Sequence, residues 1–119
     1  SGATYELGAV RRIHAPDDVI TVWCEGYATG LAILEALQLS AVHVQVIVTF
    51  SAGNLANIAR NGIVFADNDA SGTGQRAADA TGLPWIMAPE VGEDAADMRV
   101  RLGRAKFSTW IKTQILRLR

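Results

Sequence analysis

The sequence contains one cysteine, Cys24, which excludes an internal disulfide and any zinc site built from several cysteines. It also lacks a run of the roughly 20 apolar residues that a membrane-spanning helix needs, so we expect no contact with a membrane. The 119-residue sequence does not begin with a charged segment followed by an apolar one, so we expect no signal peptide. With a hydrophobic content of 50%, these absences favour a folded cytoplasmic protein.

Acidic residues are missing from the last part of the chain. Residues 1–98 contain all 12 acidic residues and four basic ones, and residues 99–119 contain the other seven of the 11 basic residues. One interpretation is a packed or solvated helix whose basic end suits the helix dipole. The other is a contact with nucleic-acid phosphates, for which the candidates are Arg99, Arg101, Arg104 and Lys106.

The apolar pattern predicts alternating strands and helices. We expect strands at 19–24, 42–50, 62–66 and 84–88, helices at 27–38, 53–60 and 72–81, and a helical segment over 95–119. Gly82 is expected to end the third helix, and Gly103 to break the last segment. This order is typical of an α/β fold with a mainly parallel, four-stranded sheet flanked by helices. Residues 4–14 are compatible with an edge strand that leads into a turn at 15–18.

Several carboxylates follow the expected strands. Glu25 comes after the first strand, Asp67 and Asp69 come after the third, and Asp94 and Asp97 come after the fourth. The carboxyl ends of parallel strands share one edge of a sheet, so these side chains are expected to converge. Neighbouring carboxylates repel and lose hydration when covered, which calls for a cation beside them. Oxygen ligands without nitrogen or sulfur favour Mg²⁺ or Mn²⁺ and phosphoryl transfer.

Four segments in this order resemble the Toprim domain, in particular that of phage- and plasmid-type DNA primases and primase-helicases. They read VWCEGYATGLAILEAL, VTFSAGNL, IVFADNDASGTGQRAA and GEDAADM. The resemblance covers about residues 19–102, and it implies a single Toprim domain of Rossmann-like fold over 1–119 that ends in a basic helix at 103–119. It places the family's strand-end glutamate, an acid–base or metal-binding residue, at Glu25. It places the family's two Mg²⁺-binding aspartates at Asp67 and Asp69.

The family's third acidic motif falls on Asp94 and Asp97. Alanines stand between these two residues, where the family usually has an aromatic residue and an amide. The resemblance leaves Asp94 and Asp97 as metal ligands or as residues that support the ligands. A separate interpretation from the residues alone is that they simply begin the last helix.

The resemblance implies the catalytic module of a DNA primase, a nucleotidyltransferase of DNA replication that makes RNA primers on single-stranded DNA with Mg²⁺ or Mn²⁺. Zinc-binding and helicase segments of a parent protein are implied partners. The chain is therefore expected to be a fragment, or a small protein with weak or no independent activity. The alternatives are a small Toprim nuclease or recombination-type protein, and a non-catalytic module that binds nucleic acid or a partner.

Some residues near the expected site have a structural interpretation beside the functional one. Tyr27 and Asn54 are candidates for contacts with a nucleotide or template, although Asn54 equally suits a helix cap. Gly72, in the SGTG segment, either approaches a phosphate or only turns the chain. Glu25 itself could cap the helix that follows it. Cys24 is expected in the core, with Trp23 on the opposite face of its strand.

Overall fold

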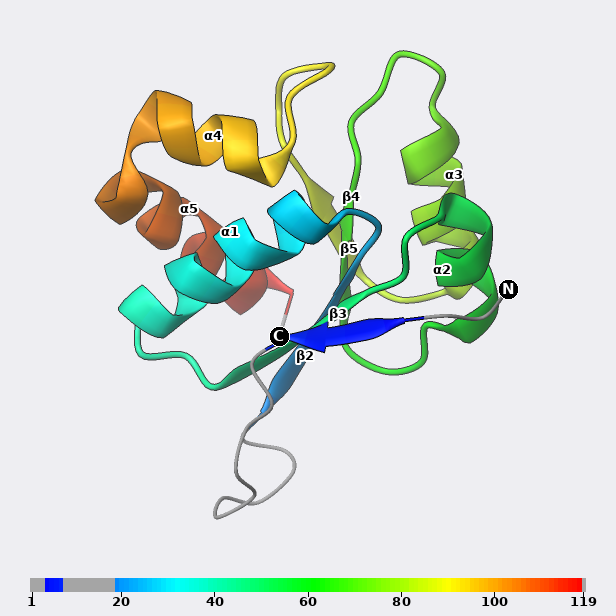
Figure 1. Cartoon of the computed structure of the whole chain (residues 1–119), viewed down its shortest axis with the longest axis horizontal. Helices are drawn as coiled ribbons and strands as arrows, with labels where there is room; N and C mark the ends of the chain where they lie inside the picture. Colours follow the sequence, from blue (N-terminus) through cyan, green and yellow to red (C-terminus); the bar gives the residue numbers. More distant parts are fainter. Residues whose placement is uncertain (1–3, 8–18, 119) are drawn as a thin grey trace.

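The computed structural model describes residues 4–7 and 19–118. Its strands are β1 (Tyr5–Leu7), β2 (Ile20–Cys24), β3 (Val44–Val48), β4 (Ile63–Ala66) and β5 (Trp85–Met87). Its helices are α1 (Tyr27–Leu39), α2 (Ala52–Ile58), α3 (Thr73–Thr81), α4 (Ala95–Leu102) and α5 (Arg104–Arg117) (Figure 1). The α/β class and the alternating order expected from the apolar pattern are confirmed.

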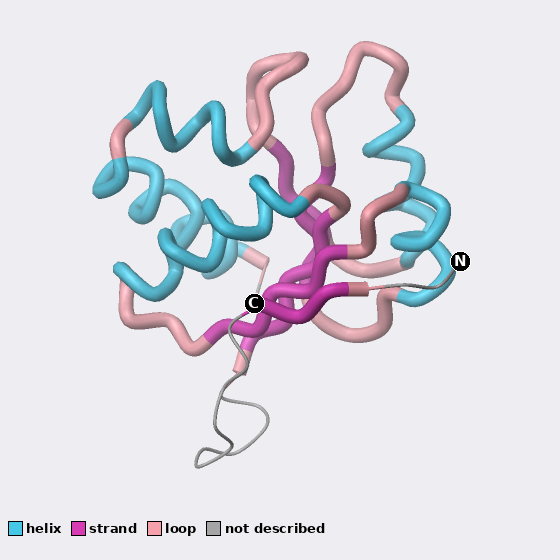
Figure 2. The backbone as a smooth tube through the Cα atoms, viewed as in Figure 1, coloured by secondary structure: helices cyan, strands magenta, loops and turns pink. Residues whose placement is uncertain are grey.

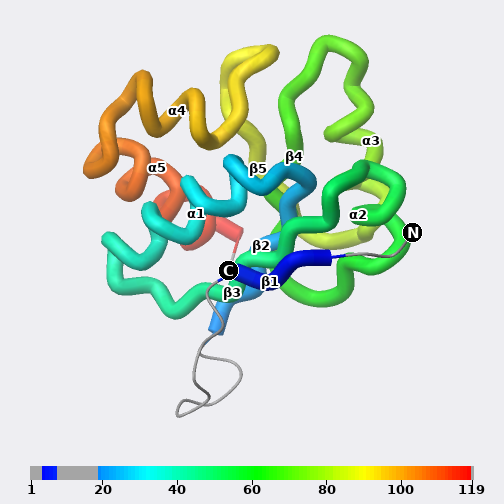
Figure 3. Tube along the Cα trace, in the orientation of Figure 1, coloured from blue at the N-terminus to red at the C-terminus, as the bar shows by residue number. Residues whose placement is uncertain are grey.

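The described sheet has five strands instead of the four expected, and their order is β1-β3-β2-β4-β5. The additional strand is β1, which pairs antiparallel with β3 at the edge of the sheet, with Tyr5 opposite Val48 (Figure 3). The other strand pairs are all parallel. The edge strand considered for residues 4–14 is thus confirmed over Tyr5–Leu7. The rest of that segment, and the turn expected at 15–18, lie outside the described residues.

The direction of the chain reverses at β2. From β2 the chain crosses to β3 on one side, and it then returns to β4 on the other side of β2. Helices α1, α4 and α5 pack together on one face of the sheet, while α2 and α3 pack together on the other (Figure 1). Such a reversal leaves a crevice at the carboxyl ends of the two diverging strands. The loops after β4 and β5 leave the sheet at that same end (Figure 2).

The two faces of the sheet carry separate apolar clusters. Residues of β2 alternate between them: Cys24 belongs to the cluster under α1, and Trp23 belongs to the cluster that includes Leu55 of α2. This confirms the expected positions of both residues. Helix α5 contributes Phe107 and two isoleucines to the larger cluster, so the apolar core extends beyond residues 19–102. Burying a side chain such as Phe107 contributes about 1.5–3 kcal/mol to stability.

Glycines end two of the helices where the sequence predicted. Gly82 ends α3 with a φ of 72°, and Gly103 separates α4 from α5 with a φ of 85°. Both angles lie in the region that favours glycine, because it has no β-carbon. Among the described residues, no helix is both long and apolar enough to cross a bilayer.

Candidate functional site

The centre of the site is a pair of carboxyl groups on neighbouring strands. Glu25 directly follows β2, and Asp67 directly follows β4. The register of these parallel strands, with Trp23 opposite Val64, carries both residues to the same edge of the sheet. Their side chains share a hydrogen bond. The structure therefore brings together the two acidic residues that the sequence placed on different strand ends.

The surroundings of this pair raise the pKa of both groups. Burial raises the pKa of Glu25 from 4.5 to about 7, assisted by the charge of Asp67, the hydrogen bond to Asp67 and the charge of Asp69. Burial also raises the pKa of Asp67, assisted by the charges of Asp94 and Asp69, although the hydrogen bond from Glu25 acts in the opposite direction. The hydrogen bond thus favours the protonated form of Glu25 and the charged form of Asp67. The site carries excess negative charge that a proton or a cation would relieve.

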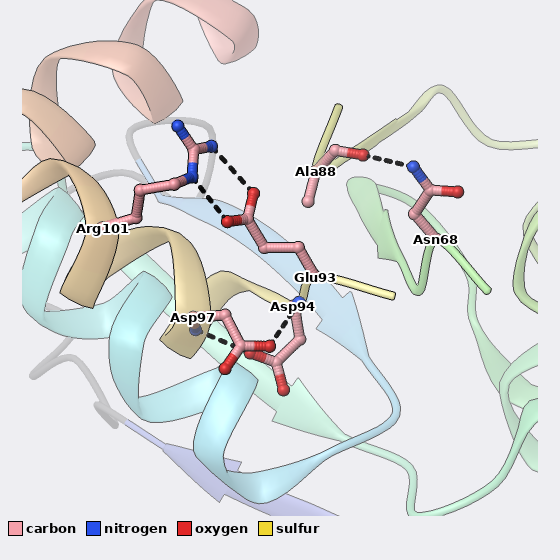
Figure 4. A network of polar contacts seen from close by, with 6 residues as sticks. All are labelled: Asn68, Ala88, Glu93, Asp94, Asp97 and Arg101. Carbon is pink, nitrogen blue, oxygen red and sulfur yellow. Dashed lines mark hydrogen bonds and ion pairs between the residues drawn. The ribbon is translucent and has the colours of Figure 1, made fainter. Parts of the chain in front are cut away.

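Asp94 belongs to the same site, whereas Asp97 serves the helix that follows. Asp94 is the N-cap of α4: its Oδ1 accepts a hydrogen bond from the Asp97 N–H at 2.8 Å. In return, Oδ2 of Asp97 accepts from the Asp94 N–H at 3.1 Å (Figure 4). This reciprocal capping box satisfies backbone donors at the start of α4. The structural interpretation therefore holds for both residues, and Asp94 combines it with a place beside Asp67.

Asn68 ties two loops of the site together. Its side-chain Nδ2 donates to the carbonyl oxygen of Ala88 at 2.7 Å, after β5 (Figure 4). Its own carbonyl oxygen accepts a hydrogen bond from the Gly92 N–H at 2.6 Å. No role was expected for Asn68 from the sequence, although its place between Asp67 and Asp69 was the available signal. These bonds fix the aspartates relative to the loop that carries Asp94.

Asp69 is more exposed than Asp67 and is held within its own loop. Its Oδ1 accepts a hydrogen bond from the Ser71 hydroxyl at 2.9 Å, and its carbonyl oxygen accepts from the Gly72 N–H at 3.1 Å. Gly72 has a φ of 75° and forms the N-cap of α3. Gly72 therefore turns the chain between the aspartates and α3.

Gly74 allows α3 to approach Asp67. A β-carbon at this position would lie 2.1 Å from the carbonyl oxygen of Asp67, far inside van der Waals contact. Phosphate contact and chain turning were the two roles expected for the SGTG glycines, and close packing of a helix against the site is a third. Gly74 thereby sets the position of the Asp67 backbone.

A pocket of about 400 Å³ opens beside the carboxyl pair. The loops after β4 and β5 and the start of α1 line it, with the residues Gly26, Tyr27, Ala28, Thr29, Asp67, Asn68, Asp69, Gly92, Glu93 and Asp94. The N-cap of α1 is Gly26, and no side chain caps this helix, so Glu25 does not have the capping role considered for it. An uncapped helix N-terminus presents N–H groups that favour an anion such as phosphate.

The donor set suits a hard divalent cation. Among the described residues, no three histidine, cysteine or acidic side chains are gathered closely enough to enclose a metal ion. Mg²⁺ usually takes only one or two carboxylates and completes its shell with water and phosphate oxygens. Glu25 and Asp67, with Asp69 adjacent in the pocket wall, provide oxygen donors of this kind. The residues present therefore fit Mg²⁺ bound together with a phosphate.

Cys24 is not part of this donor set. The side chain is fully buried, and burial raises the pKa of its thiol to about 12, assisted by the charges of Asp67 and Glu25. The thiol stays protonated at neutral pH, so it is neither a ligand nor a nucleophile there.

The predicted basic contacts are mostly occupied within the protein. Arg99 binds Glu35 of α1 at 2.5 Å, and Arg104 lies 3.5 Å from the same carboxylate. Arg101 binds Glu93, a pocket residue, through two hydrogen bonds of 2.6 and 2.8 Å (Figure 4). Lys106 is exposed on α5. The three arginines thus fasten α4 and α5 to α1 and to the pocket loop, which favours the packing interpretation of the basic segment.

Asn54 is buried below the carboxyl end of β3. Its side-chain Nδ2 donates to the carbonyl oxygen of Thr49 at 3.0 Å. The cap of α2 is Ser51, whose hydroxyl accepts a hydrogen bond from the Asn54 N–H. Asn54 therefore supports the loop between β3 and α2, and Ser51 has the capping role that was considered for Asn54. Contact of Asn54 with a nucleotide or template stays a prediction.

Comparison with known proteins gives no further guide to this site. No family model, no curated protein and no solved structure matches the chain. The geometry and electrostatics of the site, together with the resemblance of the four sequence segments, are therefore what indicate a function.

Proposed function

We propose that the chain is a Toprim-type catalytic module for Mg²⁺-dependent phosphoryl transfer on nucleic acids. The observation that carries this proposal is the Glu25–Asp67 carboxyl pair, which lies where the chain reverses at β2 and beside the uncapped start of α1. Both carboxyl groups have a raised pKa, and no basic residue is found among the described residues that line the pocket. This arrangement is costly for stability alone. A divalent cation with a bound phosphate would make it favourable.

In this proposal each residue has a distinct role. Asp67 and Asp69 would hold the metal ion, which when bound neutralises and orients phosphate oxygens. Glu25 has a pKa of about 7, so it is suited to accept a proton from an attacking hydroxyl near neutral pH. The N–H groups at the start of α1 would bind a phosphate. Asn68 keeps the two loops in place.

We further propose that the phosphoryl transfer is primer synthesis, in a cytoplasmic DNA primase or primase-helicase. It is supported by the order and spacing of the four Toprim-like segments. Nucleotides and single-stranded DNA are the substrates in this proposal, and zinc-binding and helicase segments of the parent protein are the partners. Because several arginines are engaged with glutamates, much of the template contact is assigned to those other segments.

Metal binding is the first test, because it does not require the parent protein. Mn²⁺ is titrated into the chain and followed by electron paramagnetic resonance, with calorimetry for Mg²⁺. We expect Asp67→Asn to weaken binding at least about tenfold, which corresponds to losing a charged ligand worth about 1.4 kcal/mol or more. Asp79→Asn is the matched control: it removes one charge from α3, and the amide oxygen still accepts from Trp85 Nε1. Binding that Asp67→Asn leaves unchanged would overturn the proposal.

The reaction itself is then tested on two substrates. Single-stranded circular DNA with ribonucleotides and Mg²⁺ reports primer synthesis, and supercoiled plasmid with Mn²⁺ reports nicking. Primers that depend on Asp67 support the primase assignment. Nicking that depends on Asp67 would replace it with the nuclease alternative.

A further inference from the structure

The exposed aromatic side chains are confined to one region of the molecule. Tyr5, Tyr27 and Phe50 are 50%, 48% and 56% exposed. The other five aromatic residues of the chain are buried or half-buried. Tyr27 begins α1 directly after the β2 end, Phe50 follows the β3 end, and Tyr5 lies on β1 opposite Val48 near that same end. All three therefore surround the edge of the sheet that carries Glu25 and Asp67.

Phe50 has an unfavourable conformation for its residue type. Its φ is 67°, in the left-handed region that bulky side chains rarely adopt. Its N–H donates to the carbonyl oxygen of Glu25 at 2.8 Å, which fixes its backbone beside the carboxyl pair. Glycine would meet this φ without strain. An exposed phenylalanine adds strain and gains little packing, and such outliers are concentrated at functional sites.

Tyr27 is oriented by a second aromatic ring. Its ring packs edge-to-face against Tyr5, with centroids 5.8 Å apart and an interplanar angle of 79°. Tyr27 also lines the pocket that contains Asp67 and Asp69. Its ring is thus held at the mouth of the proposed catalytic site, with nearly half of its surface open to solvent.

We propose that Tyr27 and Phe50 form a stacking platform for unpaired bases of single-stranded DNA, with Tyr5 supporting Tyr27. This inference rests on the proposed function, in which DNA is the template. Every base has an uncharged π-face, so aromatic rings bind single strands with little sequence preference. The acidic residues beside the rings disfavour a phosphate at the platform but do not oppose a neutral base. The platform would hold the template bases while the pocket holds the phosphate and metal.

The main test measures binding of a fluorescein-labelled 12-nucleotide oligothymidylate by anisotropy, with the whole 119-residue chain. We expect Tyr27→Ala and Phe50→Ala each to weaken binding about 5- to 100-fold, the range for loss of one stacked base. Tyr27→Phe keeps the ring and should bind within about twofold of the unaltered protein. Leu39→Ala is the matched control, because Leu39 is 53% exposed at the opposite end of α1.

Two further measurements separate stacking from other effects. An oligonucleotide with 2-aminopurine should lose fluorescence when its base stacks on the platform, and an abasic oligonucleotide should bind as weakly as the alanine variants do to the normal one. Phe50→Gly should weaken binding without lowering the unfolding temperature, because it relieves the strained φ. No binding by the unaltered protein, equal binding of the abasic strand, or unchanged binding by both alanine variants would overturn the platform.

The failure of the platform and that of the proposed function have different signatures. The oligonucleotide titration is repeated in EDTA and set beside the Mn²⁺ titration. Ring-dependent oligonucleotide binding without Asp67-dependent Mn²⁺ binding would retain the platform and overturn the catalytic proposal. Asp67-dependent Mn²⁺ binding without ring-dependent oligonucleotide binding would do the reverse.

Discussion

The carboxyl groups of Glu25 and Asp67 share a hydrogen bond across two neighbouring parallel strands, at the point where the chain reverses direction. Two carboxyl groups this close are stable only when one of them keeps its proton or when a cation lies between them. The fold supplies the contact, since β2 and β4 both end at the same sheet edge. The pair is therefore a local cost in stability that the proposed metal ion would remove.

The first prediction concerns the pH dependence of stability without metal. The pKa of Glu25 is about 7 in the folded protein against an ordinary value of 4.5, so the folded state binds more protons between these values. The contribution of Glu25 to the unfolding free energy is then largest below about pH 4.5, and it is lost as the pH rises through 7. After discounting for the solvent exposure of this half-buried group, we expect a loss of about 1 kcal/mol. Urea unfolding in EDTA at pH 5 and pH 8 measures it.

The variant Asp67→Asn isolates this effect. It removes the charge that faces Glu25, so its unfolding free energy should fall less between pH 5 and pH 8 than that of the unaltered protein. Asp79→Asn should follow the unaltered protein, because Asp79 bonds to Trp85 away from the pair. Parallel pH profiles for the unaltered protein and Asp67→Asn would contradict the prediction.

The second prediction is competition between protons and Mg²⁺. A cation held by Asp67 and Asp69 would lie beside Glu25 and lower the pKa of its carboxyl group, so Glu25 would lose its proton when the metal binds. The affinity for Mg²⁺ should therefore rise with pH and level off above about pH 7.5. Calorimetry in buffers of different ionisation enthalpy should detect a proton released on binding at pH 6.5 and little release at pH 8. Release that does not change with pH would show that the protonation of Glu25 is not coupled to metal binding.

The sequence predicted most of the backbone because its apolar pattern is strong. The bounds of strands β2 to β5 and of helices α1 to α3 differ from the expected ones by at most two residues. The glycines that end α3 and α4 were also predicted. The three-residue strand β1 is short and two of its residues are exposed, so its pattern was weak and the strand count was wrong by one. Sequence spacing also indicated that Glu25 and Asp67 converge, since both follow parallel strands.

The roles of individual side chains were less predictable. Asn68 bonds to a carbonyl beyond the next strand, and Arg99 pairs with Glu35 on another helix. Such partners depend on tertiary packing, which spacing along the chain does not reveal. The same holds for Phe50, whose positive φ follows from the loop geometry and not from its residue type. The sequence therefore did not predict the side-chain partners that are set by tertiary packing.

The third prediction concerns two glycines in helices. Gly74→Ala would place a β-carbon 2.1 Å from the Asp67 carbonyl oxygen, so α3 or Asp67 must move. We expect a loss of about 2–4 kcal/mol in unfolding free energy and weaker Mn²⁺ binding. Gly53→Ala is the control: a β-carbon there meets nothing within 4 Å, so the change should stabilise α2 by about 0.5–1 kcal/mol. Unaltered Mn²⁺ binding in a folded Gly74→Ala protein would show that α3 does not position Asp67.

The last prediction concerns Arg101, which Glu93 holds at the rim of the pocket. The hydrogen bond from Arg101 holds the pKa of Glu93 below its ordinary value, so the pair is charged at neutral pH and its charges cancel. Glu93→Gln removes the acid and leaves an uncompensated guanidinium beside the proposed phosphate site. We expect oligonucleotide binding to strengthen about threefold in 50 mM salt and by much less in 0.3 M salt, because salt screens exposed charges.

The matched control is Glu6→Gln, which removes a charge from β1 and keeps a side chain able to bond with Gln45. If the gain from Glu93→Gln depends on Arg101, then adding Arg101→Ala to the same protein should cancel it. If Glu6→Gln strengthens oligonucleotide binding by the same amount, the effect comes from the change in net charge and not from the release of Arg101. A gain that survives the removal of Arg101 would show that Glu93 acts by its own repulsion of phosphate, with no contribution from the released arginine.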